Sequence, residues 1–184
     1  MKLAIEEINL LGREEFVSRL GLAFEDSPWV ADGAWSSRPF ESVDELHGAM
    51  VRVVEDAPDE QRMALIRAHP DLAGKAAVAG ELTPESEGEQ ASAGLDRLTP
   101  EEYDAFTRMN ASYREKFRFP MIVCVREHTK ESILRNAEGR LDNTPEEEVE
   151  TALGEVYKIA RLRLGDLVEE GGTTYVFKRE GEGR

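Results

Sequence analysis

Two copies of one short pattern, Thr-Pro-Glu-Glu at residues 99–102 and 144–147, constrain the fold of this chain more than any other feature. The threonine hydroxyl can accept a hydrogen bond from the amide three residues on. Proline suits the first helical position, and the glutamate can reach back to the threonine amide. Residues 42–45 (Ser-Val-Asp-Glu) fit the same capping box without the proline, and residues 129–132 (Thr-Lys-Glu-Ser) are a weaker version. Each pattern predicts the start of a helix.

Behind these four starts, apolar residues recur at helical spacing. The predicted buried faces are formed by Leu46, Met50, Val53 and Val54; by Tyr103, Phe106, Met109 and Tyr113; and by Leu153, Val156, Ile159, Ala160, Leu164 and Leu167. We find neither an internal repeat nor a linker that divides the chain. The sequence therefore predicts an all-α fold, a single-domain multi-helix bundle with long ordered loops over residues 1–170. The polar, glycine-rich residues 171–184 are expected to form a mobile tail.

Two segments interrupt the helical pattern. Residues 22–40 contain two tryptophans, two prolines and a glycine, and we interpret them as an ordered, aromatic-rich connection. Residues 119–125 (Phe-Pro-Met-Ile-Val-Cys-Val) form a short apolar run whose composition would suit a strand. Because no second strand is evident to pair with it, we expect a buried extended or short helical segment threaded between helices.

The formal net charge of −15 makes two classes of partner unexpected. The chain has 23 Lys and Arg residues against 38 Asp and Glu residues, so it lacks the basic excess that phosphate backbones require. The same charge opposes binding to an anionic membrane surface, and no apolar run reaches transmembrane length. We therefore expect neither a nucleic acid nor a membrane as partner.

The single cysteine, Cys124, rules out an internal disulfide framework and is compatible with a reducing compartment. The first ten residues carry acids inside their apolar stretch, unlike the hydrophobic region of a signal peptide. We expect a cytoplasmic protein. Cys124 itself lies in an apolar run, so we interpret it as a buried, inert thiol in preference to a nucleophile.

Motifs for phosphate binding, for the GxSxG nucleophile elbow and for the HExxH zinc site are absent. The three histidines, His47, His69 and His128, are scattered, and none has metal-ligand spacing to a cysteine or another histidine. Nothing in the sequence indicates a metal site, although distant residues could build one. Polar residues at helix ends are the remaining candidates for chemistry.

His69 closes a predicted helix, because Pro70 disfavours the helical conformation in the residue before it. A histidine there serves either as a positioned acid/base or as a partner of the helix dipole. Residues 86–90 (Ser-Glu-Gly-Glu-Gln) precede a stretch of small residues. Their Glu89 and Gln90 either border a pocket or lie in a solvated turn.

Arg163 lies one helical turn from both Ile159 and Leu167, close to the apolar stripe of the last helix. An arginine in that place either forms an ion pair with an internal glutamate or binds a carboxylate or planar polar ligand. From the residues alone, the chain is an acidic helical domain with a possible His/Glu/Arg site.

The sequence resembles the OHCU decarboxylase family, whose substrate is 2-oxo-4-hydroxy-4-carboxy-5-ureidoimidazoline (OHCU). The resemblance rests on HPDLAGKAA at 69–77, on the continuous run from SEGEQ at 86–90 to IL at 133–134, and on residues 140–168. FEDSPWVADGAW at 24–35 and RPFESVDELHGAM at 38–50 fit as well. The resemblance covers about residues 8 to 170 and implies an all-α enzyme that uses neither a metal nor an organic cofactor.

Matching the family's motifs position by position implies two catalytic residues, His69 and Glu89. The substrate-binding residues that it implies are Pro70, Ser86, Glu87, Gly88, Gln90, Met121, Ile122, Val123, Cys124, Val125 and Arg163. The chain departs from the family at Arg118, where glycine is typical, and at Asp26, where histidine is common. Arg118 borders the expected pocket, so the loop geometry there is an open question.

The resemblance implies conversion of OHCU to (S)-allantoin and CO2, the last step from urate to allantoin. In OHCU a C=N bond next to the carboxylated carbon can accept the electrons that decarboxylation releases. His69 is then expected to be the acid/base. Glu89 and Gln90 would hold ring and ureido N–H groups or orient His69, and Arg163 would bind a carbonyl or carboxylate oxygen.

A homodimer is implied by the resemblance, as is a functional link to urate oxidase and 5-hydroxyisourate hydrolase. One alternative is a non-catalytic acidic helical interaction module. Another is hydrolysis of 5-hydroxyisourate, the preceding intermediate, which is usually the task of a β-rich fold.

Overall fold

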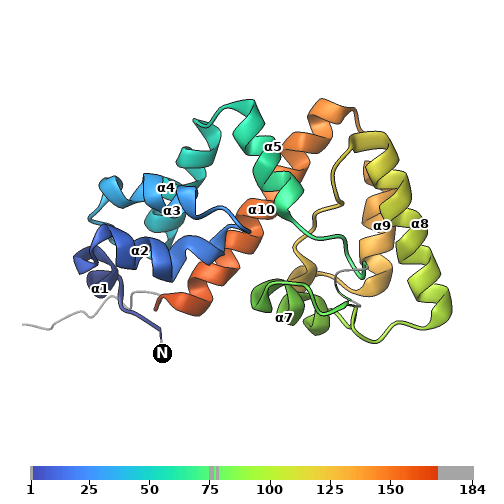
Figure 1. Cartoon of the computed structure of the whole chain (residues 1–184), viewed down its shortest axis with the longest axis horizontal. Helices are drawn as coiled ribbons and strands as arrows, with labels where there is room; N and C mark the ends of the chain where they lie inside the picture. Colours follow the sequence, from blue (N-terminus) through green and yellow to red (C-terminus); the bar gives the residue numbers. More distant parts are fainter. Residues whose placement is uncertain (1, 75–76, 78, 170–184) are drawn as a thin grey trace, which may run out of the picture.

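Helix α10 (Pro145–Leu167) is the longest helix of the computed structural model, which describes residues 2–74, 77 and 79–169. It crosses the middle of an elongated molecule (Figure 1). The other α-helices are α1 (Ile5–Leu10), α2 (Arg13–Leu20), α3 (Pro28–Ala34), α4 (Val43–Glu55), α5 (Asp59–Ala68), α7 (Pro84–Ser92), α8 (Pro100–Phe117) and α9 (Lys130–Arg140). Three short 3₁₀ helices join them: η1 (Gly21–Ala23), η2 (Trp35–Ser37) and η3 (Val125–Glu127). The described residues form no named strand, so the all-α prediction is confirmed.

The capping boxes predicted at Thr99 and Thr144 are complete in the structure. The weaker candidate at Thr129 is complete too, because the Ser132 hydroxyl takes the place of the acid. The full box predicted at Ser42 was wrong. Its hydroxyl accepts from the Glu45 amide, but the Glu45 carboxylate accepts from the amide one residue before Ser42 instead.

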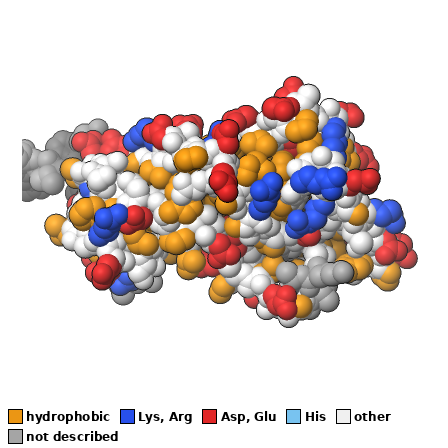
Figure 2. Space-filling model, turned by 45° about the horizontal axis from the view of Figure 1, so that its top comes forward, with side chains coloured by type: hydrophobic (Ala, Val, Ile, Leu, Met, Phe, Trp, Pro, Cys, Tyr) orange, Lys and Arg blue, Asp and Glu red, His pale blue; other side chains and the backbone are white. Residues whose placement is uncertain are grey.

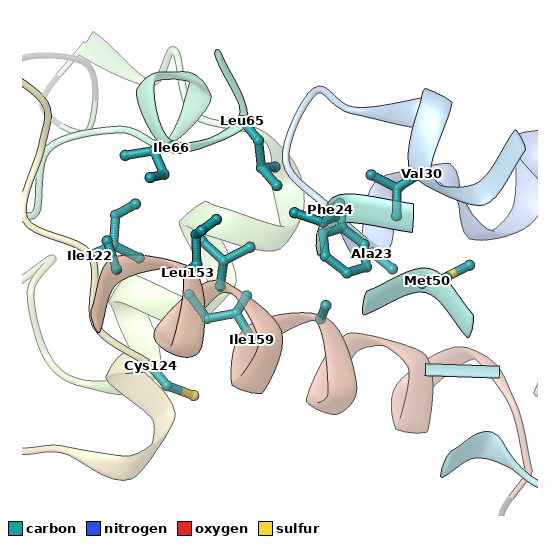
Figure 3. Packing of buried hydrophobic residues seen from close by; sticks show 14 of the residues in the cluster. Ala23, Phe24, Val30, Met50, Leu65, Ile66, Ile122, Cys124, Leu153 and Ile159 are labelled. Carbon is teal, nitrogen blue, oxygen red and sulfur yellow. The ribbon is translucent and has the colours of Figure 1, made fainter. Parts of the chain in front are cut away.

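The hydrophobic core follows α10 from end to end. Near its C-terminal half lie η1, α2 and α4, whereas α5 and α8 contact the helix elsewhere along its length. Figure 3 shows Phe24, Val30 and Met50 gathered at one stretch of the helix, and Ile66, Ile122 and Leu153 at another. One continuous core therefore joins the two halves of the molecule. Most of the predicted apolar positions are buried, but Tyr103 and Leu167 at the margins of their faces are exposed.

Both irregular segments are ordered. Residues 22–40 contain helix α3, which begins with Pro28 at its first turn and which the aromatic and proline content had not indicated. Residues 119–124 are extended and buried, then turn into η3, as predicted. Leu3 forms an isolated parallel bridge with Val168, which brings the two ends of the described chain together. The expected mobile tail, 171–184, lies outside the described residues.

None of the described helices is both long enough and apolar enough to span a membrane.

Candidate active site

The end of α5, helix α7, the buried segment 121–125 and α10 meet around a small cavity of about 30 Å³. It is lined by His69, Pro70, Leu72, Ser86, Glu89, Gln90, Met121, Ile122, Val123, Val125, Ile159 and Arg163. Ten of these are residues that the sequence predicted for the site, although they come from four separate parts of the chain. Leu72 and Ile159 line the cavity too, but the sequence analysis did not predict them for the site. Among the predicted residues, Glu87 and Gly88 lie exposed on α7 and Cys124 does not line the cavity.

His69 follows the last residue of α5, where its extended backbone ends the helix as Pro70 requires. Its side chain is 7% exposed, and Nδ1 lies 3.0 Å from the Leu65 carbonyl oxygen. Because a carbonyl can only accept, Nδ1 carries the hydrogen in this contact and Nε2 has the free lone pair. Nε2 makes no hydrogen bond with the described residues. The imidazole is therefore set up to accept a proton at Nε2.

The pKa of His69 is lowered, and burial is the largest cause. Three charged side chains act on the ring: Glu25 and Glu89 raise its pKa, and Arg163 lowers it. The hydrogen bond to Leu65 raises it as well. Since burial prevails, His69 is neutral at neutral pH and available as a base.

Arg163 is 4% exposed and uses all five of its N–H groups. Nε and Nη2 donate to the two carboxylate oxygens of Glu89, each at 2.8 Å. Nη1 donates to Glu25 Oε2 at 2.8 Å and to the Leu22 carbonyl at 3.2 Å, and Nη2 also donates to Ser86 Oγ at 3.2 Å. Of the two roles considered from the sequence, the internal ion pair is formed here. A substrate oxygen would have to displace one of these acceptors to reach the guanidinium.

Glu25 is a charged residue beside the cavity that the sequence analysis missed. It is 3% exposed, and its Oε1 accepts from Thr83 Oγ1 at 2.8 Å while Oε2 accepts from Ser86 Oγ at 2.9 Å. Burial raises the pKa of Glu25, but the charge and hydrogen bonds of Arg163 and the Thr83 bond outweigh this and hold it below its usual value. The sequence offered one signal for it: Glu25 is an acidic residue within FEDSPW, a motif that the family resemblance includes, and it directly precedes Asp26.

The charges around the cavity do not balance. Two carboxylates, Glu25 and Glu89, contact a single guanidinium, Arg163, while His69 is neutral. The group therefore carries one net negative charge in a buried place. Such an excess favours proton uptake or a ligand that brings N–H donors.

Gln90 fixes the loop that follows Pro70. Its Oε1 accepts from the Ala73 amide at 2.8 Å, and its Nε2 lies 3.4 Å from the Asp71 carbonyl oxygen. Ala73 has φ +49°, an uncommon value for a residue with a side chain. Asn110 supports the same loop by donating to the Leu72 carbonyl at 2.8 Å. The Gln90 amide keeps one N–H and one lone pair for a ligand.

The extended segment is fixed at two backbone groups. Arg140 Nη1 donates to the Ile122 carbonyl at 2.7 Å, and the Cys124 amide donates to Glu155 Oε2 at 2.8 Å. Burial, followed by the neighbouring carboxylates, raises the pKa of the Cys124 thiol to about 11. In Figure 3 the side chains of Cys124 and Ile122 point in different directions. Cys124 is a buried thiol, as predicted.

Arg118 occupies the left-handed position, φ +65°, that closes α8 directly before this segment. Glycine reaches that conformation without strain and is the usual residue at such a helix end. The family's typical glycine is thus explained by backbone geometry. The arginine side chain here is exposed and makes no contact with the cavity.

A larger hollow of about 470 Å³ lies on the other side of the Glu89–Arg163 pair, which lines both spaces. Arg19, Leu22, Arg126 and Asp166 are among its other lining residues. Pockets for small organic ligands usually measure about 300–1,000 Å³. The inner cavity is far below that range, so a ligand that reaches His69 must move the surrounding side chains, and the Glu89–Arg163 pair belongs to the walls of both spaces.

Within residues 2–74, 77 and 79–169, no group of three or more His, Cys, Asp and Glu side chains is arranged to hold a metal ion.

Comparison with known proteins identifies the family. The model of the OHCU decarboxylase family matches residues 9–165, most of the chain. The chain belongs to the OHCU decarboxylase family. It is 44% identical over 173 residues to the 2-oxo-4-hydroxy-4-carboxy-5-ureidoimidazoline decarboxylase of Halalkalicoccus jeotgali, covering 94% of this chain and 96% of that protein. The protein of the same name from Haloferax volcanii is 46% identical over 165 residues, covering 90% and 96% of the two chains.

Solved structures of related proteins have the same fold. A structure of (S)-allantoin synthase superposes with a TM-score of 0.72 at 29% identity, covering 90% of this chain and 54% of that longer chain. A structure of OHCU decarboxylase determined in the presence of (S)-allantoin has a TM-score of 0.64 at 23% identity and covers 85% and 98% of the two chains. At that identity the second likeness shows the fold alone.

Proposed function

We propose that this chain is a carboxy-lyase that converts OHCU to (S)-allantoin and CO2, the last step of urate degradation to allantoin. The observation that carries the proposal is the neutral, buried His69, with its free Nε2 on a cavity shared with Glu89 and Arg163, in a member of this family. Relatives over most of the chain bear the decarboxylase name.

The proposed chemistry needs no external electron acceptor. As the bond to the carboxylate breaks, its electron pair forms a C=C bond, and the pair of the adjacent C=N bond moves to nitrogen, which takes up a proton. The product is an enol. The enol hydroxyl then gives its proton to His69 Nε2, and the neighbouring carbon gains a proton on one face. With CO2 released and His69 returned to its neutral form, the reaction takes up one proton from solvent in all. A base with a lowered pKa, neutral before the step, suits this transfer.

The other side chains are proposed to bind and orient the substrate. Glu89 and Gln90 would accept from and donate to the ring and ureido groups, while Ser86 and the segment 121–125 complete the wall. Arg163 would bind a substrate oxygen once Glu89 releases part of the guanidinium, because all five N–H groups are engaged beforehand. Binding and opening of the pair are therefore one event in this proposal.

We further propose a cytoplasmic homodimer that works after urate oxidase and 5-hydroxyisourate hydrolase. Support for the pathway comes from relatives named as uric acid degradation bifunctional proteins. The one from Bacillus subtilis is 36% identical, and the match covers 34% of that longer protein. A monomer in light scattering would overturn the dimer without affecting the proposed reaction.

The test is to generate OHCU in the cuvette from urate with urate oxidase and 5-hydroxyisourate hydrolase. Circular dichroism then follows the appearance of (S)-allantoin. We expect rapid formation of one enantiomer with the wild type and slow, racemic product with His69→Ala. If the two proteins give the same slow racemic product, the proposed function is wrong.

A non-catalytic acidic interaction module would show no catalysis in this assay. The structure does not favour it, because the acidic side chains on the face shown in Figure 2 are scattered. Lys and Arg side chains gather on the half of that face that contains α7, α8 and α9, despite the net charge of −15.

A further inference from the structure

Glu25 lies directly behind the cavity wall. It does not line the cavity, yet it contacts two residues that do, Ser86 on α7 and Arg163 on α10. Its second oxygen binds the hydroxyl of Thr83, the residue that caps the start of α7. One carboxylate, from the turn between η1 and α3, therefore joins the two helices that carry Glu89 and Arg163.

The contacts fix orientation as well as position. Glu25 Oε2 accepts from both Ser86 Oγ and Arg163 Nη1, and Ser86 Oγ in turn accepts from Arg163 Nη2. These three groups form a closed ring of hydrogen bonds. The plane of the guanidinium is set by this ring, so Nε and Nη2 are aimed at the two oxygens of Glu89.

We propose that Glu25 is a positioning residue for the decarboxylation: it orients Arg163 and Ser86 so that Glu89 faces the cavity. The inference rests on the proposed function for its catalytic meaning. It assigns a role to a residue that does not line the cavity and that acts through Arg163.

The charged groups that face His69 come from three elements: Glu25 from the turn after η1, Glu89 from α7 and Arg163 from α10. With Glu25 neutral, Arg163 is balanced by Glu89 alone and the buried negative excess disappears. The imidazolium then loses one of its two stabilising charges, so the pKa of His69 falls further. A residue that only filled space would leave the titration of His69 unchanged.

The experiment compares Glu25→Gln with Asp26→Asn in the OHCU assay over a range of pH. Both variants remove one carboxylate charge, at adjacent positions, but Asp26 is exposed and makes no ion pair or hydrogen bond among the described residues. For Glu25→Gln we expect kcat to fall at least about tenfold. We also expect the His69-dependent limb of the pH profile to move to lower pH by about half a unit or more. Asp26→Asn should match the wild type in both.

Glu25→Asp separates charge from geometry. Its carboxylate keeps the negative charge, so the pH limb should stay near that of the wild type. It is one methylene shorter and cannot bind Thr83 and Arg163 together, so kcat should remain low. Should Glu25→Gln fail to fold, as judged by circular dichroism, Glu25→Asp decides alone: wild-type kcat in that variant overturns the proposal.

Failure of the inference is distinguishable from failure of the proposed function. A wild type that forms no (S)-allantoin overturns the function. An active wild type whose Glu25→Gln variant behaves like Asp26→Asn overturns only the role of Glu25. An NMR titration of the His69 ring, with the signal assigned by its loss in His69→Asn, measures the effect of the Glu25 charge on the pKa of His69 without an activity assay. An unchanged titration in Glu25→Gln would contradict that effect.

Discussion

Two buried arginines, Arg140 and Arg163, are both paired with carboxylates, but in different arrangements. Arg140 binds one carboxylate, that of Glu148, which is fully buried. This carboxylate also accepts hydrogen bonds from Tyr113 Oη and Asn143 Nδ2. That network is charge-balanced, and neither member of the pair lines the cavity beside His69. Arg163 instead holds two carboxylates, and it lines both the inner cavity and the outer hollow.

The difference indicates which network serves the fold and which serves chemistry. A balanced pair with every partner supplied by the protein has little to gain from rearrangement. A group with one excess negative charge beside a cavity changes its energy whenever a proton or ligand arrives. The two networks still meet at one point, because Arg140 holds the Ile122 carbonyl of the cavity wall.

The largest expected effect is on stability, from Glu148→Ala. The change leaves Arg140 buried without its carboxylate, and breaking a buried ion pair typically costs about 3–5 kcal/mol. Urea denaturation followed by circular dichroism measures the loss. The matched double variant, Arg140→Met with Glu148→Leu, removes both charges and should lose clearly less. If the single and double variants are equally destabilised, the pair is not what stabilises this region.

Next in size is a loss of activity with Arg163→Lys. Lysine keeps the charge but cannot present two parallel N–H groups to Glu89 while binding Glu25 and Ser86. We expect kcat/KM for OHCU to fall about a hundredfold, which corresponds to about 2.7 kcal/mol.

Arg140→Lys is the matched control for Arg163→Lys. It should lower the free energy of unfolding, yet change kcat/KM several times less, since it reaches the cavity only through the Ile122 carbonyl. Equal losses of activity in the two variants would remove the distinction between a structural and a functional arginine.

The contrast between the two networks also explains what the sequence could predict. Three capping boxes were found because their partners are three residues apart, and helical faces were found because their period is local. The Glu25–Arg163 contact joins residues 138 positions apart. No periodicity encodes that distance, so Glu25 was missed although its neighbour Asp26 was noted.

Most of the candidate site came from matching motifs rather than from residue chemistry. The chemistry alone left His69, Glu89 and Arg163 with two interpretations each. The structure brings all three to one cavity, but it also uses Arg163 in the internal ion pair that was one of those interpretations. Charge pairing of this kind depends on where helices α7 and α10 meet, which only tertiary packing decides.

A smaller effect concerns pH, and it is specific to the Arg163 region because the Arg140 network contains no histidine. The folded pKa of His69 lies below the ordinary value of 6.5, so the unfolded chain binds more protons as the pH falls below about 6.5. The neutral His69 therefore contributes its full share to the free energy of unfolding above pH 6.5, and this contribution decreases below pH 6.5. For one histidine, the free energy of unfolding changes by at most about 1.4 kcal/mol per pH unit.

His69→Asn tests this contribution when unfolding free energies are measured at pH 7.5 and pH 5.5. The variant should lose less stability than the wild type between the two values. Some loss should persist, because burial also lowers the pKa of His47, with the same sign. An identical loss in both proteins would mean that His69 is not held neutral by its surroundings.

The smallest expected effect is that of Tyr113→Phe, and it asks how fully satisfied the Arg140 network is. Burial and the hydrogen bond to Glu148 raise the pKa of Tyr113, so its hydroxyl stays protonated and donates. Removing it leaves Glu148 with Arg140 and Asn143, so no charge loses its only partner. We expect a loss of about 1 kcal/mol in urea denaturation and unchanged kcat/KM. A loss as large as that of Glu148→Ala would show that the hydrogen bond from Tyr113, which joins α8 to α10, stabilises this region as much as the ion pair between α9 and α10 does. A loss of activity without a loss of stability would extend the functional network to this side of the molecule, and the comparison between the two arginines would then fail.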